Sequence, residues 1–440
     1  MMRASTVDHP RVIIVQTTPY STNSSSRTLD SYFHYWERDR VRQIFSRNWK
    51  PQKGHCGELF QITDANLVKR WLHKTKETGR IYRYDELEEQ GTSEVITDNA
   101  ALTRGYKIGK SHTPTVELLR GILWKKNYWC TKQFTDWLDG YKPEVVFYNF
   151  TYNLFLAKIA IFIADRYDIP IITAIADDYY FNDSIHGLKA LTPTYLALRK
   201  RYKKMVRELF ARRGSAVFGC DKINDKYSDE FGIAGETIYY NSTVERRPFK
   251  PVDPTNPSIV YFGNIRLGRY KALLDVANAL FEINPLIKFE IYSNETEEQY
   301  CQELKSHPSV LWGGAIPYDK VKRKIAESDI YVVAESFSDE DINFTRYSLS
   351  TKAADGLMSG MVVLGYGSSE SGVISYLEST GAAVVCSQPD KLKSTIRNIL
   401  KDQDLQRRLY EQSEQVAYEN HTLESSTKKF EGVVERTLGI

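Results

Sequence analysis

Short apolar runs rich in β-branched and aromatic residues alternate with longer segments of helical period along most of this chain. This alternation is typical of parallel α/β layers, in which each buried strand is followed by an amphipathic helix. The first clear strand is expected at 11–17, and a helix is expected over 28–44. The stretch from 46 to 113 is less regular, and its elements are not assigned.

The pattern becomes regular after residue 113. Expected helices cover 115–126, 131–138, 153–167 and 194–212, and expected strands cover 144–148, 170–175, 215–219 and 237–240. Residues 241–257 then hold four prolines, Pro248, Pro251, Pro254 and Pro257, among polar residues. That composition is typical of an interdomain linker.

A second series of alternating elements begins at residue 258. Expected strands cover 259–262, 287–292, 310–312, 330–333, 361–365 and 382–385, and the tail from 391 onward has a helical pattern. The prediction is α/β, with two doubly wound domains at 1–240 and 258–420, a linker at 241–257, and a terminal helix at 421–440 that can pack back on the first domain. Ligands of such sheets bind beyond the carboxyl ends of the strands, so two facing sheets would hold a ligand in a cleft.

The length and composition of the chain indicate a globular protein and argue against a membrane-spanning, exported or disulfide-rich one. A chain of 440 residues can bury two full hydrophobic cores. No window of about 18 consecutive apolar residues predicts a transmembrane helix, and the polar residues 1–10 lack the apolar core of an export signal. The five cysteines are scattered, with neither a disulfide framework nor metal-ligand spacing. We therefore expect a cytoplasmic protein.

The positive charge is concentrated in one segment. Residues 199–213 hold eight Lys/Arg and one Glu, a net charge of 8 − 1 = +7, whereas the whole chain carries +3. Tyr202, Met205, Val206, Leu209 and Phe210 form an apolar stripe at helical spacing in this segment. Two interpretations remain open. The stripe packs on the first sheet and the cations are solvated, or the helix lies on an anionic membrane surface. No nucleic-acid motif accompanies the charge.

The stretch 346–360 carries the clearest chemistry. A hydroxyl-rich segment opens a helical pattern, and a glycine ends it before a buried strand. Ser350 and Thr351 can cap the helix or donate to a ligand, and Lys352 adds a positive charge. The amide groups and dipole of a helix N-terminus favour phosphate, and Asp355 can accept hydrogen bonds from sugar hydroxyls. An ordinary capped helix packed on a sheet would show the same pattern.

Further candidates follow other predicted strands. Gly263 and Asn264 open the turn after 259–262, and Arg266, Arg269 and Lys271 cluster just beyond them. Gly263 permits a tight turn, and arginine can grip a diphosphate with two parallel hydrogen bonds.

Two loops complete the set. Residues 335–344 are acidic, and residues 365–372 are glycine-rich and carry Glu370. Together with 346–360 these segments follow consecutive strands, where a nucleotide would bind.

These segments resemble GT-B glycosyltransferases, in particular glycosyltransferase family 4 (glycosyltransferase group 1). The resemblance covers roughly residues 140–440 and rests on VYFGNIRLGRYKALLDVANAL, IAESDIYVV, SLSTKAADGLMSGMVVLGYGSSESGV and GAAVV in the second half, and on AVFGCDKINDKYSDEFGI and IYYNST before the hinge. It implies two Rossmann-like domains facing across a cleft. It also implies metal-independent sugar transfer with retention, from a donor on the second domain to an acceptor mainly on the first.

The resemblance also implies roles for particular residues. The ribose-binding acid of the family falls on Asp355, and its paired acid falls on Tyr347, so an acid in 335–341 is the alternative partner. The basic pair falls on or near Arg269 and Lys271. The His-Asp pair of the family is replaced here by Ala176, Asp177 and Asp178, so a catalytic role passes to Asp177 or Asp178.

The sequence therefore predicts a retaining glycosyltransferase of the hexosyltransferase type. Its donor is a UDP- or GDP-linked sugar, its acceptor is a glycan or a lipid-linked glycan, and its pathway is surface polysaccharide or glycoconjugate assembly. Catalytic roles are assigned to Arg269, Lys271, Asp177 and Asp178, and donor binding is assigned to Gly263, Asn264, Ser350, Thr351, Lys352, Asp355 and Glu370. No cofactor, metal or nucleic acid is expected. The location would be cytoplasmic, with the alternative of peripheral attachment to the inner face of the cell membrane. A nucleotide-sugar epimerase and a non-catalytic partner subunit on the same fold remain open.

Overall fold

The computed structural model describes residues 9–20, 27–88, 113–182 and 192–440. Two compact units make up the chain. The N-terminal unit contains Met1–Phe218, Asn224–Thr237 and Lys429–Ile440, and the C-terminal unit contains Gly219–Ile223 and Ile238–Lys428. The first eight residues, most of the polar N-terminal stretch, lie outside the described residues.

The N-terminal unit is built on an eight-stranded sheet in the order β4-β3-β2-β1-β5-β6-β7-β8. Only the β3–β4 pair is antiparallel among its described strand pairs. The strands are β1 (Val12–Gln16), β2 (Val41–Phe45), β3 (Glu58–Gln61), β4 (Arg80–Arg83), β5 (Val145–Asn149), β6 (Ile171–Ile175), β7 (Gly214–Phe218) and β8 (Gly235–Thr237). The predicted α/β class is confirmed for this unit.

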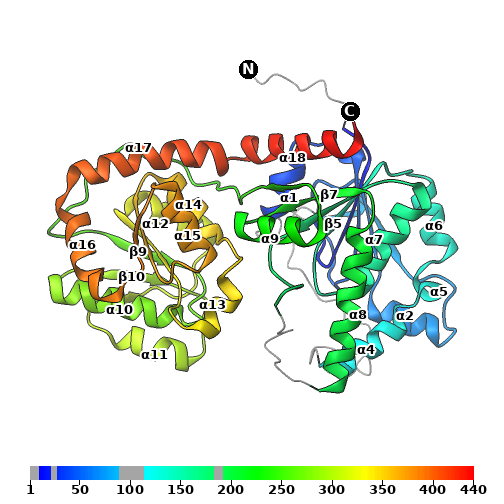
Figure 1. Cartoon of the computed structure of the whole chain (residues 1–440), viewed down its shortest axis with the longest axis horizontal. Coiled ribbons are helices and arrows are strands. Elements are labelled where there is room, and N and C mark those ends of the chain that lie inside the picture. The colour runs from blue at the N-terminus through cyan, green and yellow to red at the C-terminus, as the bar shows by residue number, and fades with distance from the viewer. Residues whose placement is uncertain (1–8, 21–26, 89–112, 183–191) are drawn as a thin grey trace. The chain divides into compact units, whose positions relative to one another are not determined.

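Helices cover this sheet and connect its parallel strands. They are α1 (Arg27–Phe33), α2 (Asp64–Trp71), α4 (Pro114–Leu123), α5 (Lys126–Trp129), α6 (Lys132–Asp139), α7 (Leu154–Tyr167), α8 (Pro193–Phe210) and α9 (Asp221–Phe231), with short 3-10 turns η2 (Arg38–Arg40) and η3 (Tyr84–Glu86). The apolar helix α7 packs on β1, β5 and β6, and α8 packs on α7 and α4 (Figure 1).

The helix expected over 28–44 is wrong in its second half. Helix α1 ends at Phe33, and residues 41–45 form strand β2 between β1 and β3. Val41, Ile44 and Phe45 are buried there. The pairing of β2 with parallel strands on both sides satisfies its backbone groups, and this tertiary gain outweighs the local helical pattern. Strand β8 also ends at Thr237, where the expected strand began.

The apolar stripe of α8 is buried in the N-terminal unit. Tyr202, Met205, Val206 and Leu209 are each at most 4% exposed. Membrane binding through insertion of this stripe is therefore wrong. The stripe packs inside the N-terminal unit, as the other interpretation expected, but α8 lies mainly against helices α7 and α4, and Arg199 is buried with it. Lysines and arginines of the segment remain exposed on the opposite side, namely Lys200, Arg201, Lys204, Arg207 and Arg213. Within the described residues, no helix is both long and apolar enough to cross a membrane.

The C-terminal unit is built on a six-stranded parallel sheet in the order β11-β10-β9-β12-β13-β14. The strands are β9 (Ile259–Phe262), β10 (Phe289–Tyr292), β11 (Val310–Trp312), β12 (Ile330–Ala334), β13 (Val362–Tyr366) and β14 (Val384–Cys386). Relative to the chain, this is the 3-2-1-4-5-6 order of a Rossmann sheet. The direction of winding reverses between β9 and β12, which is where such sheets bind ligands.

Helices lie on both faces of this second sheet. Figure 1 shows α10 and α11 on one face and α12, α14 and α15 on the other. The helices are α10 (Arg269–Ile283), α11 (Glu298–Ser306), α12 (Tyr318–Glu327), α13 (Asp339–Thr345), α14 (Thr351–Ser359), α15 (Gly372–Thr380), α16 (Leu392–Lys401), α17 (Gln403–Asn420) and α18 (Leu423–Leu438), with the 3-10 turn η4 (Pro389–Lys391). The last part of α18, from Lys429, belongs to the N-terminal unit.

The proline-rich stretch 241–257 is packed within the C-terminal unit. The Ser242 hydroxyl donates to Asp355 Oδ1 at 2.7 Å, and the Arg247 amide donates to Ser359 O at 3.2 Å. Lys250 Nζ lies 2.8 Å from Asp329 Oδ1. These contacts tie the stretch to helix α14 and to Asp329, the residue just before β12.

Candidate functional site

The segments after β9, β12 and β13 meet at the carboxyl edge of the C-terminal sheet. Gly263 follows β9 with φ +128°, and a Cβ added there would lie 2.2 Å from Lys352 Cε on α14. Gly367 follows β13, where a Cβ would lie 2.8 Å from Glu335 O. Glycine is needed at both positions because each backbone lies directly against its neighbour. The loops after these three strands therefore lie against one another at the edge where the direction of winding reverses.

Lys352 lies at the centre of this cluster. Its Nζ donates to the Tyr261 hydroxyl at 2.9 Å, and that hydroxyl donates to Asn264 O at 2.6 Å. Desolvation of Nζ and the nearby Arg269 charge lower the pKa of Lys352 to about 7. An anion that approaches Nζ would raise this pKa, and the lysine would then gain a proton near pH 7.

Arg269 lies beside this lysine. It is the first residue of α10 and follows Gly268, whose left-handed φ of +68° forms the N-cap. Its Nη2 donates to Glu335 Oε1 at 3.0 Å, and the side chains are only 14% and 2% exposed. Desolvation lowers the pKa of Arg269, but the charge and hydrogen bond of Glu335, together with Tyr261 and Asp341, raise it overall. Glu335 therefore holds the guanidinium at the strand edge.

The N-terminus of α14 closes one side of the cluster. The Ser350 hydroxyl caps the helix by accepting from the Lys352 amide at 3.3 Å, and Thr351 is the first helical residue. The helix ends at Gly360, whose φ of +76° is left-handed. The helix, cap and terminal glycine expected from 346–360 are thus present. The amides of Lys352 and Ala353 bond to Ser350 Oγ and Ser350 O, so a phosphate at this helix start would compete with the serine cap.

Asp355 is buried one turn into α14 and is already hydrogen-bonded. Its Oδ1 accepts from the Ser242 hydroxyl at 2.7 Å and from the Tyr318 hydroxyl at 3.4 Å. The carboxylate therefore joins α14 to the 241–257 stretch and to α12. Its proposed contact with ribose would have to be made from this position.

Two cations and one acid from the predicted set do not contact the cluster around Lys352. Lys271 is exposed on α10. Arg266 is committed to two carboxylates, since its Nε and Nη2 donate to Glu295 and Glu297. Glu370 is exposed and paired with Arg346. The structure therefore brings Arg269, but not Lys271, next to Lys352.

The acids predicted in the N-terminal unit lie in the turn after β6. Asp178 Oδ1 accepts from the Phe181 amide at 2.8 Å and from the Tyr227 hydroxyl at 3.1 Å, which fixes the turn. Asp177 is exposed, and its Oδ2 accepts from the Tyr179 hydroxyl at 3.2 Å. The hydrogen bonds of Asp178 therefore stabilise the turn itself, and Asp177 is the more accessible of the two acids.

Arg199 anchors the same turn and was assigned only to the basic segment by the sequence. It is 6% exposed, and its guanidinium donates to the carbonyl oxygens of Tyr179 and Tyr180. No local signal indicates this role, because the spacing of the cations does not distinguish one buried arginine from its solvated neighbours.

Two residues of the C-terminal cluster, Tyr261 and Glu335, are not predicted as site residues from the sequence. The position of Tyr261 inside a strand predicts a core residue, yet its hydroxyl accepts a hydrogen bond from Lys352. In the sequence, Glu335 is one of several acids in the segment 335–344. Its place directly after the buried strand β12 is the signal that could have separated it from the others. Ser371 Oγ, at the N-cap of α15, is buried without a hydrogen-bond partner in the described structure.

Solved structures share this architecture. Alr3699/HepE from Anabaena, determined with UDP and glucose, matches with a TM-score of 0.56 and 11% identity, over 97% of this chain and 100% of HepE. Sucrose-phosphate synthase from Thermosynechococcus elongatus matches with a TM-score of 0.56 and 10% identity, over 98% of this chain and 100% of the synthase. TarM of S. aureus matches with a TM-score of 0.50 and 12% identity, over 68% of this chain and 57% of TarM.

No protein family profile and no curated protein matches this sequence. The structural matches therefore establish the fold. With its two Rossmann-like sheets of eight and six strands, the chain has the GT-B glycosyltransferase fold, as its sequence predicted.

Proposed function

We propose that the chain is a nucleotide-sugar-dependent glycosyltransferase that binds its donor at the carboxyl edge of the C-terminal sheet. The observation that carries the proposal is the meeting of Lys352, Arg269 and the first turn of α14 at Gly263. Two cationic side chains and a helix N-terminus suit a diphosphate. The structures of HepE with UDP and with UDP-glucose, on the same fold, support this choice of ligand.

The proposed role of these cations is to stabilise the negative charge of the leaving nucleoside diphosphate. Departure of the nucleoside diphosphate builds negative charge on its terminal phosphate, and preorganised cations stabilise charge that develops in the transition state. Lys352 would take a proton as the diphosphate binds, and Arg269, held by Glu335, would supply a fixed positive charge. Asp355 would accept from the ribose, and Lys271 would act from the exposed face of α10.

The finer parts of the proposal rest on the sequence resemblance. We propose transfer of a hexose with retention, from a UDP- or GDP-sugar on the C-terminal unit to a glycan or lipid-linked acceptor on the N-terminal unit. Asp177 is the acid that we propose to face the acceptor, because Asp178 is engaged within its turn. Assembly of surface polysaccharide or glycoconjugates is the proposed pathway.

Nucleotide release from a panel of UDP- and GDP-sugars tests the proposal. We expect slow release with one donor, faster release when acceptor glycans are added, and loss of both in Lys352→Met. Lys393→Met is the matched control, because Lys393 pairs with Glu282 on the outer helices. Inversion at a sugar carbon without release would instead indicate an epimerase. Absence of both donor binding and turnover would overturn the proposal and favour the partner-subunit alternative.

A further inference from the structure

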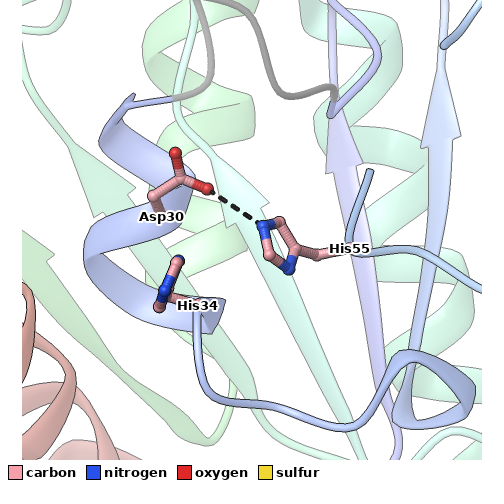
Figure 2. A group of neighbouring side chains, drawn as sticks. All are labelled: Asp30, His34 and His55. Atoms are coloured by element: carbon pink, nitrogen blue, oxygen red, sulfur yellow. Dashed lines mark ion pairs between the residues drawn. The ribbon is translucent and has the colours of Figure 1, made fainter. Parts of the chain in front are cut away.

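Three metal-ligating side chains meet in the N-terminal unit. Asp30 lies on α1, His34 directly follows that helix, and His55 lies in the segment before β3. A carboxylate oxygen and one nitrogen from each imidazole all lie within 4.8 Å of one another. Figure 2 shows Asp30 and His55 facing each other, with His34 next to them at the end of α1.

We propose that Asp30, His34 and His55 bind a first-row transition-metal dication, with Zn²⁺ as the expected ion. Two imidazoles and one carboxylate are a ligand set that suits Zn²⁺ and its neighbours, whereas Mg²⁺ and Ca²⁺ prefer oxygen alone. Ligand atoms about 2.0–2.2 Å from a tetrahedral ion would require these three side chains to close slightly. All three are half-buried, which leaves room for that movement and for a fourth ligand from solvent.

A supporting residue already orients the carboxylate. The Tyr20 hydroxyl donates to Asp30 Oδ1 at 2.9 Å, and Tyr20 is 1% exposed. The Tyr20 amide donates to Gln43 Oε1 at 2.7 Å, which fixes the tyrosine in place. Metal-ligating carboxylates are commonly held by such hydrogen bonds. Oδ1 is also the oxygen that faces His55, 3.6 Å from its Nε2, so Tyr20 holds the carboxylate toward the histidine.

Only the tertiary structure assembles this set. Asp30 and His34 are four residues apart, so the end of α1 brings their side chains close together, but His55 comes from a distant segment. No linear ligand motif links the three positions. The site lies in the other unit from the proposed donor site, shares no residue with it, and does not depend on the proposed function.

Competition against a chromophoric chelator tests the site on the full-length protein after metal removal. We expect one Zn²⁺ per chain, bound far more tightly than Mg²⁺, and visible d–d absorption of the Co²⁺ form. His34→Gln and His55→Gln should each weaken Zn²⁺ binding by more than tenfold, and Tyr20→Phe should weaken it by about tenfold. His307→Gln is the control, since His307 bonds to Asn278 in the C-terminal unit.

The folding of each variant is checked by circular dichroism. Tyr20→Phe retains the buried ring, so a ligand effect can still be read if a histidine variant misfolds. Folded His34→Gln and His55→Gln proteins that bind Zn²⁺ as tightly as the wild type would overturn the proposal. Equal affinity of the wild type for Zn²⁺ and Mg²⁺ would overturn it as well.

Discussion

Arg269 and Glu335 form a buried ion pair in which each side chain keeps one polar atom without a partner in the described structure. Arg269 Nη2 lies 3.0 Å from Glu335 Oε1, whereas Arg269 Nε and Glu335 Oε2 have no hydrogen-bond partner. Loss of one member of a buried pair leaves the other charge uncompensated and costs about 3–5 kcal/mol.

We therefore expect Arg269→Gln and Glu335→Gln each to lower the melting temperature of the C-terminal unit, and the double variant to lose less than the sum. Differential scanning calorimetry measures this coupling. Arg266→Gln is the control, because Arg266 is 46% exposed and its loss should have a smaller effect. Additive losses in the double variant would contradict the coupling.

The lowered pKa of Lys352 predicts a pH dependence of donor binding. Lys352 is half protonated near pH 7 in the free protein, and a bound diphosphate raises its pKa. Binding therefore takes up a proton above pH 7, so affinity should fall by up to about tenfold for each pH unit above 7 and be flatter below it. Lys352→Met should bind weakly and lose this slope.

Isothermal titration with UDP, in buffers of different ionisation enthalpy, measures the proton uptake directly. Lys393→Met should keep the wild-type slope. A wild-type affinity for UDP independent of pH would refute the role of Lys352.

The same lowered pKa affects folding in the opposite pH direction. Between pH 7 and the ordinary lysine pKa of 10.5 the unfolded chain binds the extra proton, so this group's contribution to stability rises with pH across that window.

Gly263 should tolerate no side chain. An added Cβ would lie 2.2 Å from Lys352 Cε and would also require a φ of +128°. We expect Gly263→Ala to displace the lysine and weaken UDP binding by at least about tenfold, a loss of one charge-assisted hydrogen bond. Gly314→Ala is a matched control, because Gly314 also has a positive φ, +62°, but no atom within 4 Å of an added Cβ. Equal UDP affinity in the two variants would show that the contact with Lys352 is unimportant.

Asp355 is expected to affect both stability and donor affinity. Asp355→Ala removes the acceptor of the Ser242 hydroxyl and the proposed ribose acceptor, so UDP binding should fall roughly tenfold to a hundredfold. The control is Asp329→Asn. Asp329 is also buried and paired, but it precedes β12 at the opposite edge of the sheet. That variant should lower the melting temperature and leave UDP affinity unchanged. An unchanged dissociation constant in folded Asp355→Ala would remove the ribose assignment.

The exposed cations of α8 predict membrane attachment by charge alone. The apolar stripe is buried, so no insertion is expected, but each lysine or arginine near an anionic surface contributes about 1 kcal/mol. We expect flotation with anionic vesicles at low salt, release by about 0.3 M salt, and no flotation with neutral vesicles. Lys200→Glu with Lys204→Glu should abolish it, and Lys393→Glu should not. Failure of the wild type to float at low salt would end the membrane proposal.

Local patterns were sufficient for most of the fold. The alternation of apolar runs and helical segments predicted α/β layers because the two periodicities differ, and the short strand β9 and the capped helix α14 lie where the sequence placed them. The same local signals failed at β2, whose strand state depends on pairing with β1 and β3.

The candidate site divides in the same way. Ser350, Lys352 and Gly263 carried recognisable local signals, namely a cap, a charge at a helix start, and a glycine after a strand. No local signal distinguishes the buried Arg269 from the exposed Lys271, since both lie within the same short basic cluster. Only the packed structure turns Arg269 toward Glu335 and leaves Lys271 exposed.

The sequence by itself determined the fold class, the order of most strands and helices, and the segments that end at the ligand-binding edge. These properties depend on period, capping and glycine positions, which act over a few residues. Tertiary structure decided which charges are paired, which lysine has a lowered pKa, and which distant histidine joins Asp30 and His34. These properties depend on burial and on distances between segments far apart in the chain, and no local pattern records them.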